Sequence, residues 1–132
     1  MKGVVMYGYS KSTNLGYDDA VVRVREELQK EGFGVLTEID VKATLKKKLD
    51  ADFRRYVILG ACNPPFARRA LLAELDIGLL LPCNVIVYEN DDGGSTVSAM
   101  NAGLMAEVTG NDELKIVAEE VNVKLRKAID AV

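Results

Sequence analysis

The fold of this chain is constrained most by the alternation of short apolar runs with helical stripes of apolar residues. The stretch "RYVILGAC" (55–62) is almost continuously apolar, which is typical of an interior β-strand. Near the C-terminus, apolar residues recur every three or four positions, the spacing of one helix face: Leu114, Val117, Ala118, Val121, Leu125, Ala128 and Ile129. Strands and helices therefore alternate within one sequence, which predicts a domain of mixed class.

The same criteria predict the element order βαβαβαββα for the whole chain. Strands are expected at 3–9, 34–40, 55–62, 84–89 and 96–100, with helices between 17 and 31, 41 and 49, 64 and 75, and 112 and 129. The polar segment 10–16 is expected to be a flexible loop, with contact to an anion as the alternative. We expect one α/β (α+β) domain over residues 1–132, a two-layer sandwich with a five-stranded mixed sheet and helices mainly on one face.

Several local signals support these boundaries. Asp40, Asn63 and Asn111 each stand where an N-cap belongs, because their side chains can accept hydrogen bonds from the first backbone N–H groups of a helix. The second helix is expected to turn its apolar residues inward: Val41, Leu45 and Leu49. "NDDGG" (90–94) predicts a hairpin turn, since such turns need residues that tolerate positive φ.

Composition narrows the class of protein. The chain has 132 residues, of which 48% are hydrophobic, so it can bury a core without disulfides. Its net charge of −3 argues mildly against a dedicated nucleic-acid-binding protein, because such proteins usually carry an excess of basic residues. The N-terminus lacks the apolar core of a signal peptide, and the longest apolar stretch is too short to span a membrane. We therefore expect a cytoplasmic protein without a membrane partner.

The chain contains no histidine, and this excludes several kinds of chemistry. Ser-His-Asp and Cys-His nucleophilic machinery both need an imidazole, as do zinc sites that use histidine. No glycine pattern of a Walker or dinucleotide-binding loop is present either. The chemistry that remains is centred on two thiols.

Both cysteines of the chain are followed by asparagine, in Cys62-Asn63 and Cys83-Asn84. The first pair ends a predicted strand and the second begins the next, so we expect the two sulfurs at one end of the sheet. A helix opening at Pro64 would favour the thiolate of Cys62. Two thiolates could share a soft metal ion such as copper(I) or zinc(II), or cycle as a redox pair. The competing interpretation is that both thiols are inert core residues.

Charged residues suggest two further features. Glu38 lies on a half-buried strand, and an inward carboxylate there would need a partner, for which we considered the arginine pairs 54–55 and 68–69. Most such pairs are structural. The run 46–48 is three lysines, which usually form a solvated helix face but with these arginines could form a local basic patch.

The central part of the chain resembles the DUF302 family. The resemblance runs from about Tyr17 to Ala102 and is carried by "GFGVLTEID", "YVILGACNPPFARRAL" and "IGLLLPCNVIVYE". It implies a compact α/β fold that is commonly a homodimer. Nucleic-acid binding has been suggested for the family, and no catalytic residue carries over from it.

The leading hypothesis is a domain that binds a small ligand or a soft metal ion near Cys62, Asn63, Cys83 and Asn84, with Glu38 nearby. In this hypothesis the metal ligands would be the two cysteines. One alternative is a redox or sulfur-handling enzyme that uses the thiols. Another is a protein or nucleic-acid interaction module without chemistry. Because helices on one face leave the other face of the sheet uncovered, we also expect a homodimer.

Overall fold

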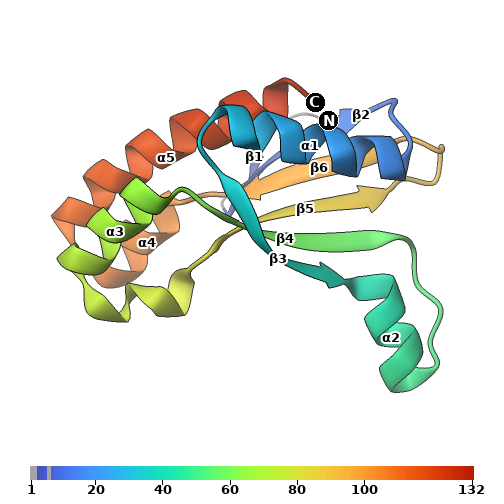
Figure 1. Cartoon of the computed structure of the whole chain (residues 1–132), viewed down its shortest axis with the longest axis horizontal. Coiled ribbons are helices and arrows are strands. Elements are labelled where there is room, and N and C mark those ends of the chain that lie inside the picture. The colour runs from blue at the N-terminus through green and yellow to red at the C-terminus, as the bar shows by residue number, and fades with distance from the viewer. Residues whose placement is uncertain (1–2, 6) are drawn as a thin grey trace.

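The computed structural model describes residues 3–5 and 7–132 of the chain. Its elements are β1 (Gly3–Val5), β2 (Gly8–Thr13), α1 (Tyr17–Lys30), β3 (Gly34–Asp40), α2 (Val41–Leu49), β4 (Tyr56–Cys62), α3 (Pro64–Ala73), the 3₁₀ helix η1 (Leu75–Leu80), β5 (Cys83–Glu89), β6 (Ser95–Met100), α4 (Gly103–Thr109) and α5 (Asp112–Asp130). Figure 1 shows one sheet with α1 and α5 lying along one of its faces. The predicted α+β class, with helices mainly on one face, is confirmed.

The strands form a six-stranded sheet in the order β1-β2-β6-β5-β4-β3. Every described pairing is antiparallel, so the sheet differs from the expected mixed one in direction, and the short β1 adds a strand. The direction depends on the connection between β4 and β5. There α3 and η1 together reverse the chain, whereas a single crossover helix would return it parallel.

The segment 10–16, expected to be a loop, is largely strand. β2 pairs along its whole length with β6, from Gly8 opposite Met100 to Thr13 opposite Ser95. The hydroxyl of Ser10 donates a hydrogen bond of 2.7 Å to Ser98 across the pair. Polar side chains are compatible with this strand because its neighbour supplies the backbone partners. The predicted strand at 3–9 becomes β1 and the start of β2, and position 6 lies outside the described residues.

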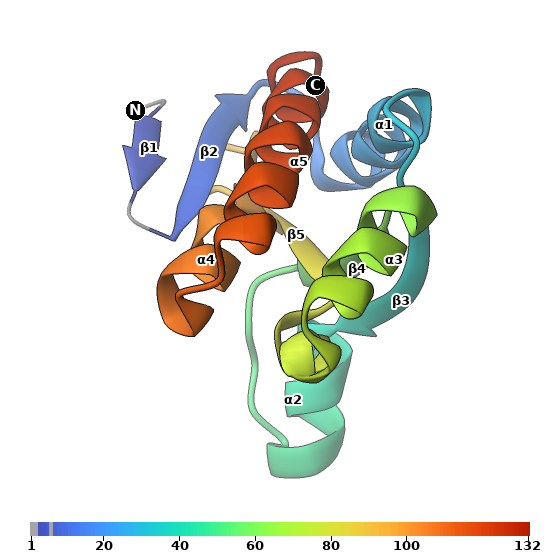
Figure 2. The same ribbon diagram turned by 90° about the vertical axis from the view of Figure 1, so that its left-hand side faces the viewer.

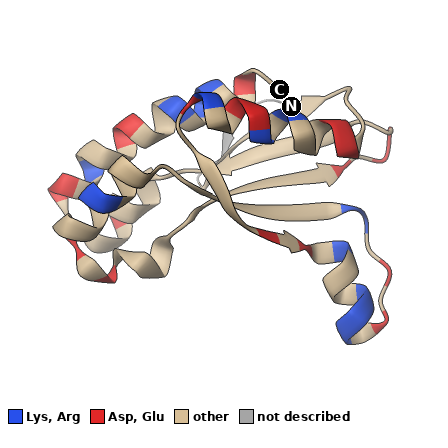
Figure 3. Ribbon diagram, viewed as in Figure 1, with Lys and Arg blue, Asp and Glu red and all other residues tan. Residues whose placement is uncertain are grey.

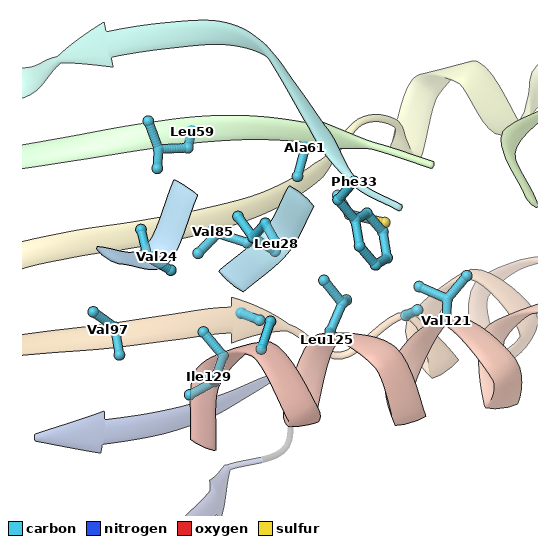
Figure 4. Close-up of a cluster of buried hydrophobic side chains, with 14 of the residues drawn as sticks. Val24, Leu28, Phe33, Leu59, Ala61, Val85, Val97, Val121, Leu125 and Ile129 are labelled. Atoms are coloured by element: carbon cyan, nitrogen blue, oxygen red, sulfur yellow. The ribbon is translucent and has the colours of Figure 1, made fainter. Parts of the chain in front are cut away.

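The core fills the space between the sheet and the helices α1 and α5. Figure 4 shows side chains of α1 and α5 meeting those of the inner strands, with Phe33 at one end of the cluster. All seven residues predicted for the apolar face of the last helix are buried, which confirms that face. The Asn111 side chain accepts a hydrogen bond of 2.9 Å from the backbone N–H of Glu113, so the predicted cap is also confirmed.

Helix α2 departs from its prediction. Its N-cap is the predicted one, since Asp40 accepts a hydrogen bond of 2.9 Å from the backbone N–H of Ala43. However, none of the residues of α2 is buried, so the inward orientation expected of Val41, Leu45 and Leu49 is wrong. Figures 1 and 2 show why: α2 projects from one end of the sheet, on the side opposite α1 and α5.

Within residues 3–5 and 7–132, no helix is both long enough and apolar enough to cross a lipid bilayer. Two short elements after the central strands, η1 and α4, were not predicted. Both lie at the end of the sheet where β4 ends and β5 begins. This end carries the candidate site.

Candidate ligand-binding cavity

A cavity of about 370 Å³ opens at the end of the sheet where β4 meets α3. Its walls come from β3, β4, α3, η1, β5 and α5. The residues that line it are Phe33, Leu36, Thr37, Ala61, Cys62, Asn63, Phe66, Ala67, Ala70, Leu71, Gly78, Leu81, Pro82, Cys83, Val117 and Val121. Nearly all of these side chains are apolar, and the size falls within the range of small-molecule sites.

The antiparallel pairing of β4 and β5 brings the two cysteines to the same end of the sheet. Ala61 lies directly opposite Cys83 in the register, so the end of β4 adjoins the beginning of β5. Cys62 and Cys83 both line the cavity. The sequence predicted that the two sulfurs lie at the same end of the sheet. In the structure the antiparallel direction of β4 and β5 brings them there.

Close packing around Gly60 shapes the wall beside the cysteines. A Cβ atom at this position would clash with the Thr37 hydroxyl oxygen and would lie 2.8 Å from Pro82, closer than van der Waals contact allows. Glycine is therefore required for Thr37 and Pro82 to approach β4 from both sides. Both residues also line the cavity, so this packing holds part of its wall in place.

The two thiols differ in environment. Cys83 is 7% exposed, and its burial, with a smaller contribution from the neighbouring Cys62, raises its pKa from 9.0 to about 11. Cys62 is only partly buried. Removal of water disfavours a charged sulfur, so at neutral pH the Cys83 thiol is protonated. Cys83 therefore contributes a neutral, weakly polar surface to the cavity.

Asn63 is placed at the N-cap of α3 as predicted, but its side chain does not cap that helix. It is buried, and its amide nitrogen donates a hydrogen bond of 3.2 Å to the backbone carbonyl of Glu31, just beyond α1. The same amide lies against Gly32, which adopts φ +86°. Asn63 thus joins the end of α1 to the beginning of α3 and fixes one edge of the cavity.

The other two candidate residues lie outside the cavity. Asn84 is exposed, because alternation along β5 turns it to the face opposite Cys83. Glu38 is not the inward carboxylate expected from the sequence: its side chain is half exposed and pairs with Arg25 of α1 at 3.0 Å. β3 is an edge strand with little cover, which explains this exposure. Of the arginines considered as partners of Glu38, Arg54, Arg55 and Arg69 have other contacts.

Those contacts also divide the suggested basic patch. Arg54 lies 3.4 Å from Asp91, Arg55 pairs with Asp18, and Lys46 pairs with Asp50 at 2.8 Å. Arg69 belongs to α3, at the opposite end of the sheet from α2 (Figure 1), so the basic residues do not gather on one surface.

An ion pair joins α3 and α5 beside the cavity. The guanidinium of Arg69 lies 2.7 Å from the Glu120 carboxylate and 5.6 Å from the ring centre of Phe66, which lines the cavity. The sequence did not predict that Phe33, Phe66 and residues of α5 line the cavity. The apolar positions of α3 carried a signal, but nothing in the sequence states which of them line a space and which fill the core.

Among the described residues, no three His, Cys, Asp or Glu side chains are grouped so that they could hold a metal ion. The two cysteines are the residues of the cavity with the softest donor atoms. The site is therefore an apolar cavity with two thiols, an amide and one hydroxyl in its wall.

Fold and cavity together define an α+β domain with one open sheet face and an apolar site at the sheet end. The chain belongs to the DUF302 family, a domain of unknown function whose family model matches residues 9–132. This match extends beyond the segment 17–102 on which the resemblance was recognised.

A solved structure has the same architecture along almost the whole chain. It is the crystal structure of an uncharacterized conserved DUF302 protein from Bacillus stearothermophilus, 30% identical, with a TM-score of 0.88 over 96% of this chain and 98% of that one. No curated protein matches the sequence.

Proposed function

We propose that this domain binds a small, neutral, apolar ligand in the cavity at the end of β4 and β5. The observation that supports this most strongly is the wall itself: about 370 Å³ lined chiefly by aliphatic and aromatic side chains, from β3, β4, α3, α5 and the adjoining loops. A pocket lined in this way favours apolar molecules, because water held against its wall finds few hydrogen-bond partners.

The electrostatics of the wall support a neutral ligand. The cavity-lining residues include no Lys, Arg, Asp or Glu. The nearest ion pair that we describe, Arg69 with Glu120, is neutralised internally. A charged ligand would lose its hydration without gaining a counter-charge, which is costly in an apolar site. Thr37 and Asn63 supply the polar groups that could orient a ligand.

A soft metal ion or a thiol redox reaction suits the site less well. Both require a thiolate, and burial raises the pKa of Cys83 to about 11, so the Cys83 thiolate is disfavoured at neutral pH. The two cysteines alone would also leave an ion such as zinc(II) with half of its usual four ligands. The apolar wall favours retention of neutral thiols.

Binding of N-phenyl-1-naphthylamine, a neutral apolar fluorophore, tests the proposal. We expect one bound probe per chain and an increase in its emission. Ala67→Phe, which fills the cavity from α3, is expected to weaken binding at least about tenfold. Ala73→Phe is the matched control on the same helix, because Ala73 is also partly buried but does not line the cavity.

Circular dichroism establishes that both variants fold. Equal binding by the wild type and Ala67→Phe would refute the cavity as the site. The metal alternative is tested with copper(I) against a competing chelator: tight binding of one ion that Cys62→Ser abolishes would replace the apolar-ligand proposal with the metal-binding one.

We also propose that the protein is a cytoplasmic homodimer. Free thiols at positions 62 and 83 suit a reducing compartment. The sheet face opposite α1 and α5 presents a row of isoleucines across three strands, since Ile39 pairs with Ile58 and Ile58 with Ile86. Tyr56 stacks on Tyr88 beside this row, with ring centres 5.4 Å apart. Sedimentation at micromolar concentration that shows only monomer would refute the dimer.

A further inference from the structure

Helix α2 packs only lightly against its own chain, beside β3 and β4. None of its residues is buried, and Leu49 at its end is 71% exposed. Its apolar residues nevertheless recur at helical spacing, with Leu45 one turn before Leu49. An isolated helix of nine residues is marginal in water, so an amphipathic helix of this length is expected to pack against something.

A second exposed apolar feature lies at the other end of the sheet. It is a groove of about 430 Å³ bounded by η1, α4 and the ends of β5 and β6. Leu79 of η1 and Val108 of α4 line it and are 87% and 71% exposed. Asn84 and Met100 also line it, on the sheet face opposite the core-facing Val85 and Ala99, so the groove reaches the open face.

The two features are arranged to meet in a symmetric pair. Figure 1 shows α2 at one end of the sheet and α4 at the other, with α2 projecting on the open side. In a dimer that pairs the open faces about a two-fold axis crossing the strands, the ends of the two sheets are exchanged. Each α2 then lies at the groove end of the other copy, and both contacts form at once, as an isologous interface requires.

The end of α2 is basic, although Lys46 pairs with Asp50 of the following loop. The last turn of α2 carries Lys46, Lys47 and Lys48. η1, which bounds the groove, contains the exposed Asp76 and no lysine or arginine, whereas Glu107 of α4 lies away from the groove, in a hollow that it shares with Lys115. Figure 3 shows basic residues on α2 and both acidic and basic residues at the far end. Complementary charge fixes the register of a contact and disfavours a contact of like features.

We propose that α2 is an exchanged arm, and that α2 of one copy packs in the groove between η1 and α4 of a second copy. Leu49 supplies the apolar anchor, and the lysines at the end of α2 lie toward Asp76 of η1. The groove shares Leu81 and Pro82 with the cavity wall, so the partner's arm lies directly behind the cavity. The second copy therefore completes the surface around the proposed ligand site.

Sedimentation of a Leu49→Glu variant tests the arm. Leu49 is largely exposed within its own chain, so the subunit is expected to keep its far-ultraviolet circular dichroism. The Kd of the dimer is expected to rise at least about tenfold. The matched control is Val123→Glu on α5, an apolar residue of 68% exposure on the opposite side of the sheet, which is expected to leave the Kd unchanged.

Disulfide trapping locates the contact. In a Cys62→Ser background, Leu49→Cys with Val108→Cys is expected to give a covalent dimer on a non-reducing gel, whereas Leu49→Cys with Val123→Cys remains monomeric. A dimer that Leu49→Glu leaves intact and that is not trapped would refute the arm and leave face-to-face pairing. A monomeric wild type would refute both, and the fluorophore assay would still decide the cavity separately.

Discussion

The two faces of the sheet have the same strands and the same backbone pairing but opposite environments. On β5, Val85 and Val87 are fully buried under α1 and α5, while Ile86 between them is partly exposed on the other face. On β4, likewise, Leu59 is fully buried, while the preceding Ile58 is partly exposed on the other face. Residues of similar hydrophobicity thus lie on both faces.

This difference teaches that hydrophobicity alone does not identify the core of this domain. The covered face is defined by the helices that pack on it. The open face is apolar enough along Ile39, Ile58 and Ile86 to need cover, and a single chain leaves it with none of the larger helices. The covered face therefore serves folding, and we propose that the open face serves association.

The largest expected effect is on stability, and it comes from substituting two neighbouring residues that lie on opposite faces of the sheet. Leu59→Ala removes a fully buried side chain and is expected to lower the free energy of unfolding by about 2 to 5 kcal/mol. Ile58→Ala on the open face is expected to cost about 1 kcal/mol in dilute protein, because less area is lost. Urea unfolding measures both, and equal losses would contradict the distinction between the faces.

The pKa of Cys83 gives the next effect. Its value of about 11 in the folded chain lies above the ordinary 9.0, so the unfolded chain loses this proton first. The contribution of this protonated thiol to the free energy of unfolding is fully present below pH 9. It is lost as the pH rises towards 11, by about 3 kcal/mol at most.

Unfolding free energies of the wild type and Cys83→Ala between pH 8 and 11 test this, because other titrating groups contribute equally to both. We expect the wild type to lose more stability than the variant across this interval. Parallel pH profiles would show that the Cys83 thiol is not protected by burial.

Alkylation compares the two cysteines directly. Cys62 is partly buried and Cys83 is buried on the covered face, so iodoacetamide at pH 7.5 is expected to modify Cys62 at least about tenfold faster. Mass spectrometry of timed digests gives the two rates. Modification of Cys83 at the same rate would mean that the covered face opens readily at this edge.

The smallest effect concerns nucleic acid. Strong salt-dependent binding needs about six phosphate contacts, whereas Arg54 and Arg55 pair with aspartates and Arg69 lies at the opposite end of the sheet from the lysines of α2. Fluorescence anisotropy with duplex DNA or RNA at 0.15 M salt is expected to show no micromolar binding. A tight complex with a steep salt dependence would assign α2 to nucleic acid rather than to a second copy.

Much of this fold was predictable from local patterns. The helices at α1 and α5, the caps at Asp40 and Asn111 and the hairpin between β5 and β6 follow from periodicity and from side chains that satisfy nearby backbone groups. These features involve residues within a few positions of one another. The short elements η1 and α4 have too few residues to show a period, which is why they were missed.

The candidate site was predictable only in part. Cys62, Asn63 and Cys83 do lie at one end of the sheet, as expected, but only because β4 and β5 pair antiparallel, which the sequence did not predict. Glu38 and Asn84 were not separated from this group, because one turns to α1 and the other to the open face. Strand alternation predicts two faces without stating which face will be covered.

The sequence by itself determined the class of fold, the apolar face of α5 and the absence of histidine chemistry, since each depends on residue type or short-range spacing. The tertiary structure decided the strand direction, the apolar cavity and the exposure of α2. These depend on which surfaces meet across long separations: Phe33, Phe66 and Val121 form one wall only because α3 and α5 pack at the end of β4. Burial of Cys83, and with it the raised pKa, is a property of that packing and of no local pattern.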